Sequence, residues 1–432
     1  GLQMGGSGDV IDYAVKMRRF REDQLLSNIA ARGDLDEQIV RALAMELARL
    51  HRQLPVCHPD PAGSKAGTPA VLKAAMDDNF HQLRCYPLAP AELEQLQTVE
   101  RWARAGFSDL LPTIQQRVTE GRVIDGHGDV HLGNIGMLDG AVTLFDCIEF
   151  NPLFRIMDTV GEIAMLTMDL HVRGHPEAAH TLLTDYLEYN GDYAGLALLD
   201  QYRSYFALVR SKVSLLSEAV DNPELTTSGA YREMRSYLEL AASYCRPRQG
   251  FVAVTLGVSG SGKTTIAGKL LAASGAVRIR SDVERKRLFD LAPEQRSQPE
   301  QERLMYCEET TQKTLDSLEQ AATDILGAGF PVIVDATCLR HSTRSRFRDL
   351  AARWQVPFVI LYCTAPLEVL RERLAQREKE GRDASEAGVA VMQHQLSALE
   401  PLSEDELALS LEVDSSTTSE DLWRRFQALL VV

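Results

Sequence analysis

The sequence lacks two features that would place it at a membrane or on nucleic acid. None of its apolar runs approaches the roughly 18–20 residues that a membrane-spanning helix needs. Lys and Arg number 46 against 61 Asp and Glu, which gives a formal net charge of −15. A general affinity for nucleic acid or for anionic lipid needs a basic surface, so this balance disfavours both partners. A local basic groove is still compatible with it.

Cysteine is scarce and scattered, and no two cysteines form a CxxC pair. The seven cysteines stand at positions 57, 85, 147, 245, 307, 338 and 363. This odd, dispersed set is typical of reduced thiols in a cytosolic protein, and it argues against a disulfide framework or a zinc site. The first residues after Gly1 resemble the middle of a domain, so the absence of a leader peptide carries no weight.

The composition is that of an ordinary globular protein, and the length suits two or three domains. Helical periodicity fills 21–55, with a break near Gly33, and returns over 158–245. Between these stretches "NIGMLDGAVTLFD" predicts a hairpin that turns on Asp139-Gly140. The segment "CRPRQG" reads as a linker. We therefore expect two domains, residues 1–246 and 247–432.

Apolar strands alternate with helical segments after the linker. The strand candidates are "FVAVTLGV" (251–258), "AVRIRSD" (276–282), "PVIVDAT" (331–337), "PFVILYC" (357–363) and "LALSLEVD" (407–414). Nearly continuous apolar strands with helical crossovers are typical of a parallel sheet covered on both faces. The sequence predicts an α/β protein whose second domain contains a five-stranded parallel sheet.

The segment "GVSGSGKTT" matches the pattern of a phosphate-binding loop at a strand–helix junction. Glycines let the backbone curl so that several N–H groups point at one anion, and the helix N-terminus adds positive partial charge. Lys263 is expected to reach the β- and γ-phosphates of ATP, and the Thr264 hydroxyl to hold Mg²⁺. The other cradle residues are Gly257, Ser259, Gly260, Ser261, Gly262 and Thr265. The alternative is a plain Gly-rich turn.

Two carboxylates follow the next strands, where an α/β sheet opens onto its binding crevice. Asp282 in "RSDVER" is a candidate general base for an acceptor hydroxyl, with Arg285 as a candidate ligand for the acceptor. A helix N-cap is the alternative role for Asp282. Asp335 ends "VIVD", a pattern typical of a carboxylate near Mg²⁺, and the alternative is again a cap.

The arginine-rich segment "VLRERLAQREKEGRD" follows the fourth strand. Arg373 and Arg377 are four residues apart and share a helix face. Guanidinium groups in a closing lid neutralise the charge of a transferring phosphoryl group, so we expect Arg377 in catalysis and Arg373 at the nucleotide. Arg382 and Asp383 are candidates for its hinge. A solvated helix with Glu/Arg pairs is the alternative.

On the motifs "GVSGSGKTT", "SDVER" and "VIVDAT", residues 250–432 resemble small P-loop kinases. These include gluconate kinase, chloramphenicol phosphotransferase, zeta toxins and the kinase domain of polynucleotide kinase. The spacing of Asp282 and Arg285 is similar to the polynucleotide kinase arrangement, in which the Asp is the base.

A second loop, "HGDVHLGN", carries an Asp and an Asn five residues apart, as kinase catalytic loops do. Asp129 is placed to deprotonate an acceptor hydroxyl, while Asn134 reaches a metal. The hairpin then delivers Asp146 where a kinase needs a second metal ligand. A metal site built on His127 and His131 explains fewer residues.

Residues 10–245 resemble the aminoglycoside phosphotransferase family, with the diagnostic core at 127–146. The order of the two halves is similar to a bacterial class of fused proteins. The family has an N-terminal lobe with a glycine loop, a strand Lys and a helix Glu, and little precedes the strand expected at 10–20. We therefore expect a kinase-like C-lobe whose N-terminal lobe is largely absent. Lys16 is more consistent with a hinge strand than with the ATP lysine.

The sequence predicts an ATP- and Mg²⁺-dependent phosphotransferase that acts on a hydroxyl of a small molecule, chiefly through its second half. One alternative is polynucleotide 5′-kinase activity, which Asp282 and Arg285 favour and the acidic charge disfavours. Another is a P-loop kinase or ATPase regulated by a non-catalytic kinase-like sensor.

Overall fold

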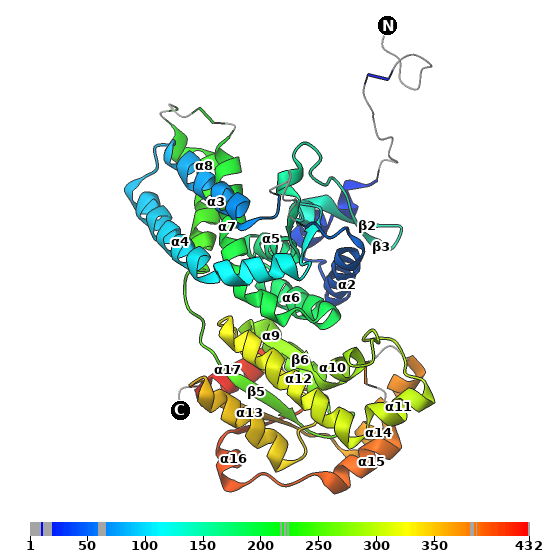
Figure 1. The fold of residues 1–432 in the computed structure, drawn as a ribbon. Helices are drawn as coiled ribbons and strands as arrows, with labels where there is room; N and C mark the ends of the chain where they lie inside the picture. The colour runs from blue at the N-terminus through cyan, green and yellow to red at the C-terminus, as the bar shows by residue number, and fades with distance from the viewer. Residues whose placement is uncertain are drawn as a thin grey trace.

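The computed structural model describes residues 10–11, 20–58, 66–216, 218–219, 222, 224–380, 384–385 and 387–430. A mostly helical first half and an α/β second half are joined by an irregular segment at 247–250 (Figure 1). Most of the strand expected over 10–20 lies outside the described residues, and so does Lys16.

Helix α5 (Thr159–Val172) is the centre of the first half, and every residue from Thr159 to Leu170 is buried. A helix buried on all sides must be apolar or must pair its polar groups. Six longer helices lie around it: α2 (Glu37–Gln53), α3 (Pro69–Arg84), α4 (Pro90–Thr119), α6 (Pro176–Asn190), α7 (Leu196–Leu215) and α8 (Gly229–Ser243). The predicted break near Gly33 separates α1 (Leu26–Ala31) from α2, and Gly33 has the positive φ of 78° that suits glycine.

The predicted hairpin is confirmed. Strands β2 (Ile135–Leu138) and β3 (Ala141–Leu144) pair antiparallel, with Leu138 opposite Ala141. Asp139 and Gly140 have φ values of 51° and 82°, as a type I′ turn requires. A second antiparallel pair joins β1 (Val123–Asp125) to β4 (Ile156–Asp158). These two short sheets frame the loop at 127–134.

The second half contains the predicted five-stranded parallel sheet. Its strands are β5 (Val252–Leu256), β6 (Val277–Arg280), β7 (Val332–Asp335), β8 (Phe358–Cys363) and β9 (Ser410–Val413), and their order is β6-β7-β5-β8-β9. Strand β6 ends at Arg280, two residues earlier than predicted, because Asp282 already belongs to helix α10 (Ser281–Arg287). β5 lies at the centre, and the phosphate-binding motif therefore starts from the middle of the sheet.

Helices cover both faces of this sheet. Helices α9 (Lys263–Ser274) and α17 (Ser419–Leu430) pack on one face, where Ile266 and Phe426 meet the alternate strand residues Ile333 and Val359. Helices α12 (Glu308–Gly327) and α13 (His341–Arg353) contribute buried residues to the other face. Helices α14 (Leu367–Glu380), α15 (Val389–Ala398) and α16 (Glu404–Ala408) connect β8 to β9.

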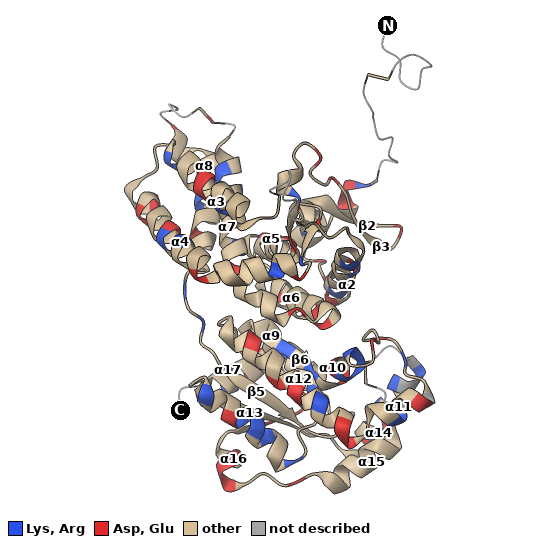
Figure 2. Cartoon of the chain, in the orientation of Figure 1, with Lys and Arg blue, Asp and Glu red and all other residues tan. Residues whose placement is uncertain are grey.

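The two halves are in direct contact. Helix α6 of the first half packs against α9 and β6 of the second half, and one cluster of buried hydrophobic residues extends from the first-half helices to the α12 face of the sheet. Acidic and basic residues are interspersed along the helices of both halves (Figure 2). None of the helices in the described part of the chain combines the length and apolarity that a membrane span needs.

Candidate active site

The loop between β5 and α9 has the backbone of an anion cradle. Gly257, Gly260 and Gly262 have φ values of 153°, 87° and 91°, which L-residues with a side chain rarely adopt. Space is restricted as well, because a Cβ on Gly257 would lie 2.5 Å from the carbonyl oxygen of Cys363. These glycines let the chain curl tightly into the first turn of α9, where unpaired N–H groups attract anions.

Lys263 is the first residue of α9, and its Nζ donates to the carbonyl oxygen of Val258 at 2.9 Å. The ammonium group is thereby folded over the loop. Desolvation lowers the pKa of Lys263 below its ordinary value, while the carboxylates of Asp335 and Asp282 act in the opposite direction. A cationic group in this position would gain a phosphate partner in place of a carbonyl.

A cavity of about 720 Å³ opens beside the loop, and the structure brings most of the predicted second-half residues to its wall. The predicted residues that line it are Ser259, Gly260, Gly262, Lys263, Thr264, Thr265, Asp282, Arg285, Asp335 and Arg377. They come from four separate segments of the chain. The parallel sheet accounts for this convergence, since the carboxyl ends of its strands meet at one edge.

Asp335 is the last residue of β7 and is 5% exposed. Its Oδ1 accepts from the hydroxyl of Thr255 at 3.4 Å, whereas its buried Oδ2 has no hydrogen-bond partner among the described residues. Nε of Arg280 lies 3.8 Å from that Oδ2. A buried carboxylate oxygen without a hydrogen bond is costly unless a cation or water meets it.

These donors fit Mg²⁺, which is usually held by one or two protein oxygens together with phosphates and waters. Asp335 and the Thr264 hydroxyl would supply the protein oxygens at this end of the cavity. The described residues contain no cluster of three or more His, Cys, Asp or Glu side chains that could hold a metal by themselves. A site here would therefore depend on the phosphates of the nucleotide.

Asp282 occupies the second position of α10, and Arg280 is the N-cap residue. The N-cap alternative for Asp282 is therefore wrong. Its side chain is 28% exposed and its Oδ1 lies 3.6 Å from Nη1 of Arg285. The guanidinium carbon of Arg285 lies 4.8 Å from the ring centre of Tyr306, and its Nε is buried without a hydrogen-bond partner among the described residues. The Nε–H group of Arg285 is thus a hydrogen-bond donor close to Asp282, the candidate general base.

The two arginines predicted for the lid, Arg373 and Arg377, lie in different surroundings. Arg377 lines the cavity, but Arg373 braces the loop from outside: its guanidinium donates to the carbonyl oxygen of Gly260 at 3.1 Å and to the hydroxyl of Ser415 at 2.5 Å. Both residues are on α14. The proposed hinge residues Arg382 and Asp383 lie outside the described part of the chain.

The loop 127–134 of the first half brings two of its predicted residues together. Nδ2 of Asn134 donates to Oδ2 and to the backbone carbonyl of Asp129, at 3.1 Å each. Nε2 of His131 lies 3.4 Å from the same carboxylate. Burial raises the pKa of Asp129, but His131 outweighs it and holds that pKa below its ordinary value. The carboxylate of Asp129 is thus held by two side chains of its own loop, as a hydroxyl-orienting group would be.

Asp146 follows β3 and is exposed, with a left-handed φ of 63°. Its neighbours are tied to the loop: the N–H of Ile148 donates to the carbonyl oxygen of His127 at 3.0 Å, and a ring nitrogen of His127 bonds Phe145 O at 2.8 Å. His127 is thereby engaged with the backbone. This contact favours a structural role for His127 over a metal site.

The group that holds this loop is Glu162, which was not among the residues predicted from the sequence. Oε1 of the buried Glu162 accepts from the N–H groups of His127 and Gly128, and its Oε2 lies 2.8 Å from Nε2 of His51. Hydrogen bonds from His51 and the loop outweigh burial and lower the pKa of Glu162. A lone Glu inside an apolar helix carries no signal of this role, although burial of that helix predicts a partner for it.

Comparison with known proteins addresses the second half directly. Residues 252–402 match the AAA domain family. Two uncharacterized proteins, Rv2004c of Mycobacterium tuberculosis and Mb2027c of Mycobacterium bovis, are each 27% identical to this chain over 379 residues, which is 88% of this chain and 74% of the relative. An alignment of that length includes parts of both halves.

Among solved structures, three kinases are similar to about two fifths of the chain. A sugar kinase from Janibacter sp. is 24% identical, with a TM-score of 0.32, and covers 43% of this chain and 96% of its own. A gluconokinase from Sinorhizobium meliloti is 22% identical, with a TM-score of 0.31, and covers 43% and 94%. The APS kinase of Mycobacterium tuberculosis is 21% identical, with a TM-score of 0.31, and covers 43% and 100%. The resemblance of the first half to aminoglycoside phosphotransferases stays a prediction.

Two further residues beside the phosphate-binding loop were not predicted from the sequence. The side-chain oxygen of Gln395 on α15 accepts a hydrogen bond from the N–H of Ser259 at 2.7 Å, so it occupies one backbone donor of the loop. Arg280 lines the cavity next to Asp335. A single Gln in a helix gives no sequence signal. Arg280 was within a predicted strand, and only the register of β6 with β7, which places it opposite Asp335, reveals its position.

Proposed function

We propose that this chain is an ATP- and Mg²⁺-dependent phosphotransferase that transfers the γ-phosphate to a hydroxyl group of a small molecule. The domains are residues 1–246 and 247–432, and the second domain carries the reaction. One observation carries the proposal: Lys263, Thr264, Asp282, Asp335 and Arg377 line a single cavity next to a glycine-rich anion cradle.

Each of these residues has a role that its position supports. Backbone N–H groups of the loop and the ammonium group of Lys263 hold the phosphates. Asp282 is outside the cradle and partly exposed, so it can meet an acceptor hydroxyl and take its proton as the oxygen attacks. Arg377 neutralises charge on the phosphoryl group in transit. Arg285 holds the acceptor.

Mg²⁺, when bound between Asp335, Thr264 and the phosphates, would supply charge neutralisation on the phosphate oxygens. The protein's own contribution is the carboxylate of Asp335, which lines the same cavity as Thr264 and whose buried Oδ2 has no hydrogen-bond partner among the described residues. The transfer itself depends on position and charge, because phosphoryl transfer needs little covalent chemistry from the protein.

The test is a screen with γ-labelled ATP over sugars, nucleosides, aminoglycosides and RNA 5′ ends, with the whole chain and Mg²⁺. We expect label in a small hydroxylated acceptor and none with Lys263→Ala, because Lys263 is the cation at the cradle. Lys313→Ala is the matched control, since that lysine is on the exposed face of α12, paired with Glu309. Release of label only as inorganic phosphate would favour an ATPase, and label only on RNA ends would favour a polynucleotide kinase.

A second candidate function belongs to the first half. The contact of Asn134 with Asp129 favours a kinase-like catalytic loop there, in which Asp129 orients a hydroxyl and Asn134 and Asp146 meet a metal. A ligand-sensing module that regulates the second half is the competing role. Substitution of Asp129 separates the two roles, because a sensor does not need a proton acceptor.

A further inference from the structure

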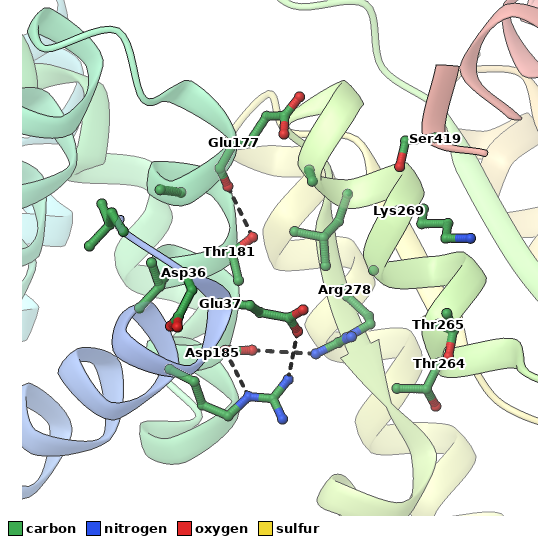
Figure 3. A pocket seen from close by; sticks show the side chains of 17 residues that line it. Asp36, Glu37, Glu177, Thr181, Asp185, Thr264, Thr265, Lys269, Arg278 and Ser419 are labelled. Atoms are coloured by element: carbon green, nitrogen blue, oxygen red, sulfur yellow. Dashed lines mark hydrogen bonds and ion pairs between the residues drawn. The ribbon is translucent and has the colours of Figure 1, made fainter. Parts of the chain in front are cut away.

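A row of alternating charges crosses from the first half to the candidate phosphate site. It begins at Arg41 on α2, whose Nε lies 3.5 Å from Oδ2 of Asp185 on α6. Oδ1 of Asp185 lies 3.4 Å from Nη2 of Arg278 on β6. Figure 3 shows Asp185 and Arg278 facing each other across the boundary between α6 and the second half.

The row continues through a second carboxylate of α6. The guanidinium of Arg278 donates to Oε1 of Glu188 at 2.8 Å, and Oε2 of Glu188 lies 3.8 Å from Nη1 of Arg280. Nε of Arg280 then lies 3.8 Å from the unbonded Oδ2 of Asp335. Arg280 is therefore between a carboxylate of the first half and the carboxylate that we assign to Mg²⁺.

The burial of these groups makes their charges interdependent. Glu188, Arg278 and Asp335 are 6%, 4% and 5% exposed. Charges at such low exposure are screened little by salt and must be matched by neighbours. A cation that arrives at Asp335 repels Arg280, and Glu188 is the carboxylate on the opposite side that can compensate this guanidinium.

We propose that Glu188 in the first half is a positioning residue for the phosphate site of the second half, and that it acts by drawing Arg280 away from Asp335. This proposal rests on the assignment of Mg·ATP to the second half. It makes the first half a structural part of the site, whether or not that half has chemistry of its own. The arrangement also gives a reason for joining the two halves in one chain.

The geometry of α10 supports the same dependence. Nη2 of Arg287 donates to the backbone carbonyl oxygen of Glu188 at 2.9 Å. The hydroxyl of Tyr193 donates to the buried carboxylate of Glu284 at 3.0 Å. Helix α10, which carries Asp282, thus contacts the first half at two points, Glu188 itself and Tyr193.

The experiment measures ATP binding to the whole chain by calorimetry over a series of Mg²⁺ concentrations. We expect Glu188→Gln to raise the Mg²⁺ concentration needed for half-maximal binding by about tenfold, because Arg280 then neutralises Asp335 without competition. ATP affinity without Mg²⁺ should change less than twofold. Asp185→Asn is the matched control: it removes the neighbouring carboxylate of α6, which contacts Arg278 and Arg41, and should leave the Mg²⁺ dependence as in the wild type.

A double substitution separates this role from a general structural one. Arg280→Gln removes the competing cation, so Glu188→Gln with Arg280→Gln should restore the wild-type Mg²⁺ dependence. A loss that persists in the double variant, or an unchanged Mg²⁺ dependence in folded Glu188→Gln, would overturn the proposal. Where Glu188→Gln does not fold, Arg280→Gln alone decides, since a higher Mg²⁺ concentration for half-maximal ATP binding in that variant contradicts a competing role. Absence of Mg·ATP binding in the wild type contradicts the proposed function instead.

Discussion

At the scale of single residues, the two carboxylates of the cavity differ in what surrounds them. Asp335 is buried at the end of a central strand, with one oxygen unbonded. Asp282 is 28% exposed on a short helix and has only Arg285 as an ion-pair partner within 4 Å among the described residues. A buried, unbonded oxygen suits a cation, whereas a partly exposed carboxylate suits a group that exchanges protons with an acceptor.

Asp282→Asn should therefore impair chemistry and spare binding. Asn keeps the size of the side chain and removes the proton acceptor, and general-base assistance is typically worth about 10²–10⁴-fold in rate. We expect a fall of that size in kcat with ATP affinity unchanged within about threefold. Asp290→Asn, at the exposed end of the same segment, is the control, because Asn tolerates its φ of 55°. A rate within about threefold of wild type would remove Asp282 from the reaction.

The same substitution in the other half tests where the reaction occurs. Asp129→Asn should leave phosphate transfer by the whole chain within about twofold of wild type, because every group we assign to the transfer is in the second half. The measurement is the rate with the acceptor found in the label screen. A fall of about 100-fold or more would assign catalysis to the loop at 127–134.

At the scale of elements, a buried ion pair fixes the segment that lines the far side of the cavity. Arg344 of α13 is fully buried, and it donates to Oε1 and Oε2 of Glu406 at 2.7 and 3.0 Å. It also donates to the carbonyl oxygens of Cys338 and Leu339, both of which line the cavity. The pair thus joins α13 and α16 to the chain after β7.

Loss of one partner should destabilise the second half strongly. Glu406→Ala leaves the guanidinium of Arg344 buried without its carboxylate, a change that typically costs about 3–5 kcal/mol. It also removes the acceptor for the N–H of Ser403. Urea unfolding, followed by tryptophan fluorescence, measures the effect, because Trp354 and Trp423 of the second half contribute to that signal. Glu404→Ala, on the exposed first turn of α16, should cost less than about 1 kcal/mol. Equal midpoints for the two variants would contradict this account.

The sequence predicted individual strands and turns, but it did not predict how these elements are arranged relative to one another. The five strands and the hairpin at Asp139-Gly140 are evident because apolar runs and turn residues act locally. The lateral strand order is a long-range property, and so is the contact of α6 with β6. Asp185 and Glu188 resemble ordinary polar residues of a helix, and only their burial against Arg278 distinguishes them.

At the scale of the whole molecule, the junction of the two halves contains histidines that are held neutral. His171 of α5 bonds the hydroxyl of Tyr244 at 2.7 Å, beside a cavity of about 360 Å³ that Arg203 and Arg248 also line. Phe330 of the second half completes this wall. Burial, together with the charges of Arg203, His180 and Arg248, lowers the pKa of His171 to about 2. A histidine so placed resists protonation only while the halves remain folded together.

The sign of the resulting pH effect follows from linkage. The unfolded chain takes up a proton at His171 near its ordinary pKa of 6.5, and the folded chain does not until about pH 2. The unfavourable effect of His171 on the free energy of unfolding is therefore absent above pH 6.5. Below pH 6.5 this group lowers the free energy of unfolding by up to about 1.4 kcal/mol per pH unit. Asp185 makes the opposite contribution to the pH dependence of stability, because burial and Glu188 raise its pKa to about 6. The wild type alone would report the sum of both effects, so the contribution of His171 is measured by comparing the wild type with a His171 variant.

His171→Gln should flatten the dependence of unfolding free energy on pH between 6.5 and 5. Gln cannot titrate, yet it can still bond the Tyr244 hydroxyl, so the folded junction keeps its contact. Urea unfolding of the wild type and the variant at pH 8, 6.5, 5.8 and 5 should show curves that converge as the pH falls, with a relative gain of about 1–2 kcal/mol for the variant at pH 5. His81→Gln, at an exposed position on α3, should leave the slope unchanged. Parallel curves for wild type and His171→Gln would mean that His171 takes up its proton in the folded protein, and the junction would then have no acid sensitivity from this residue.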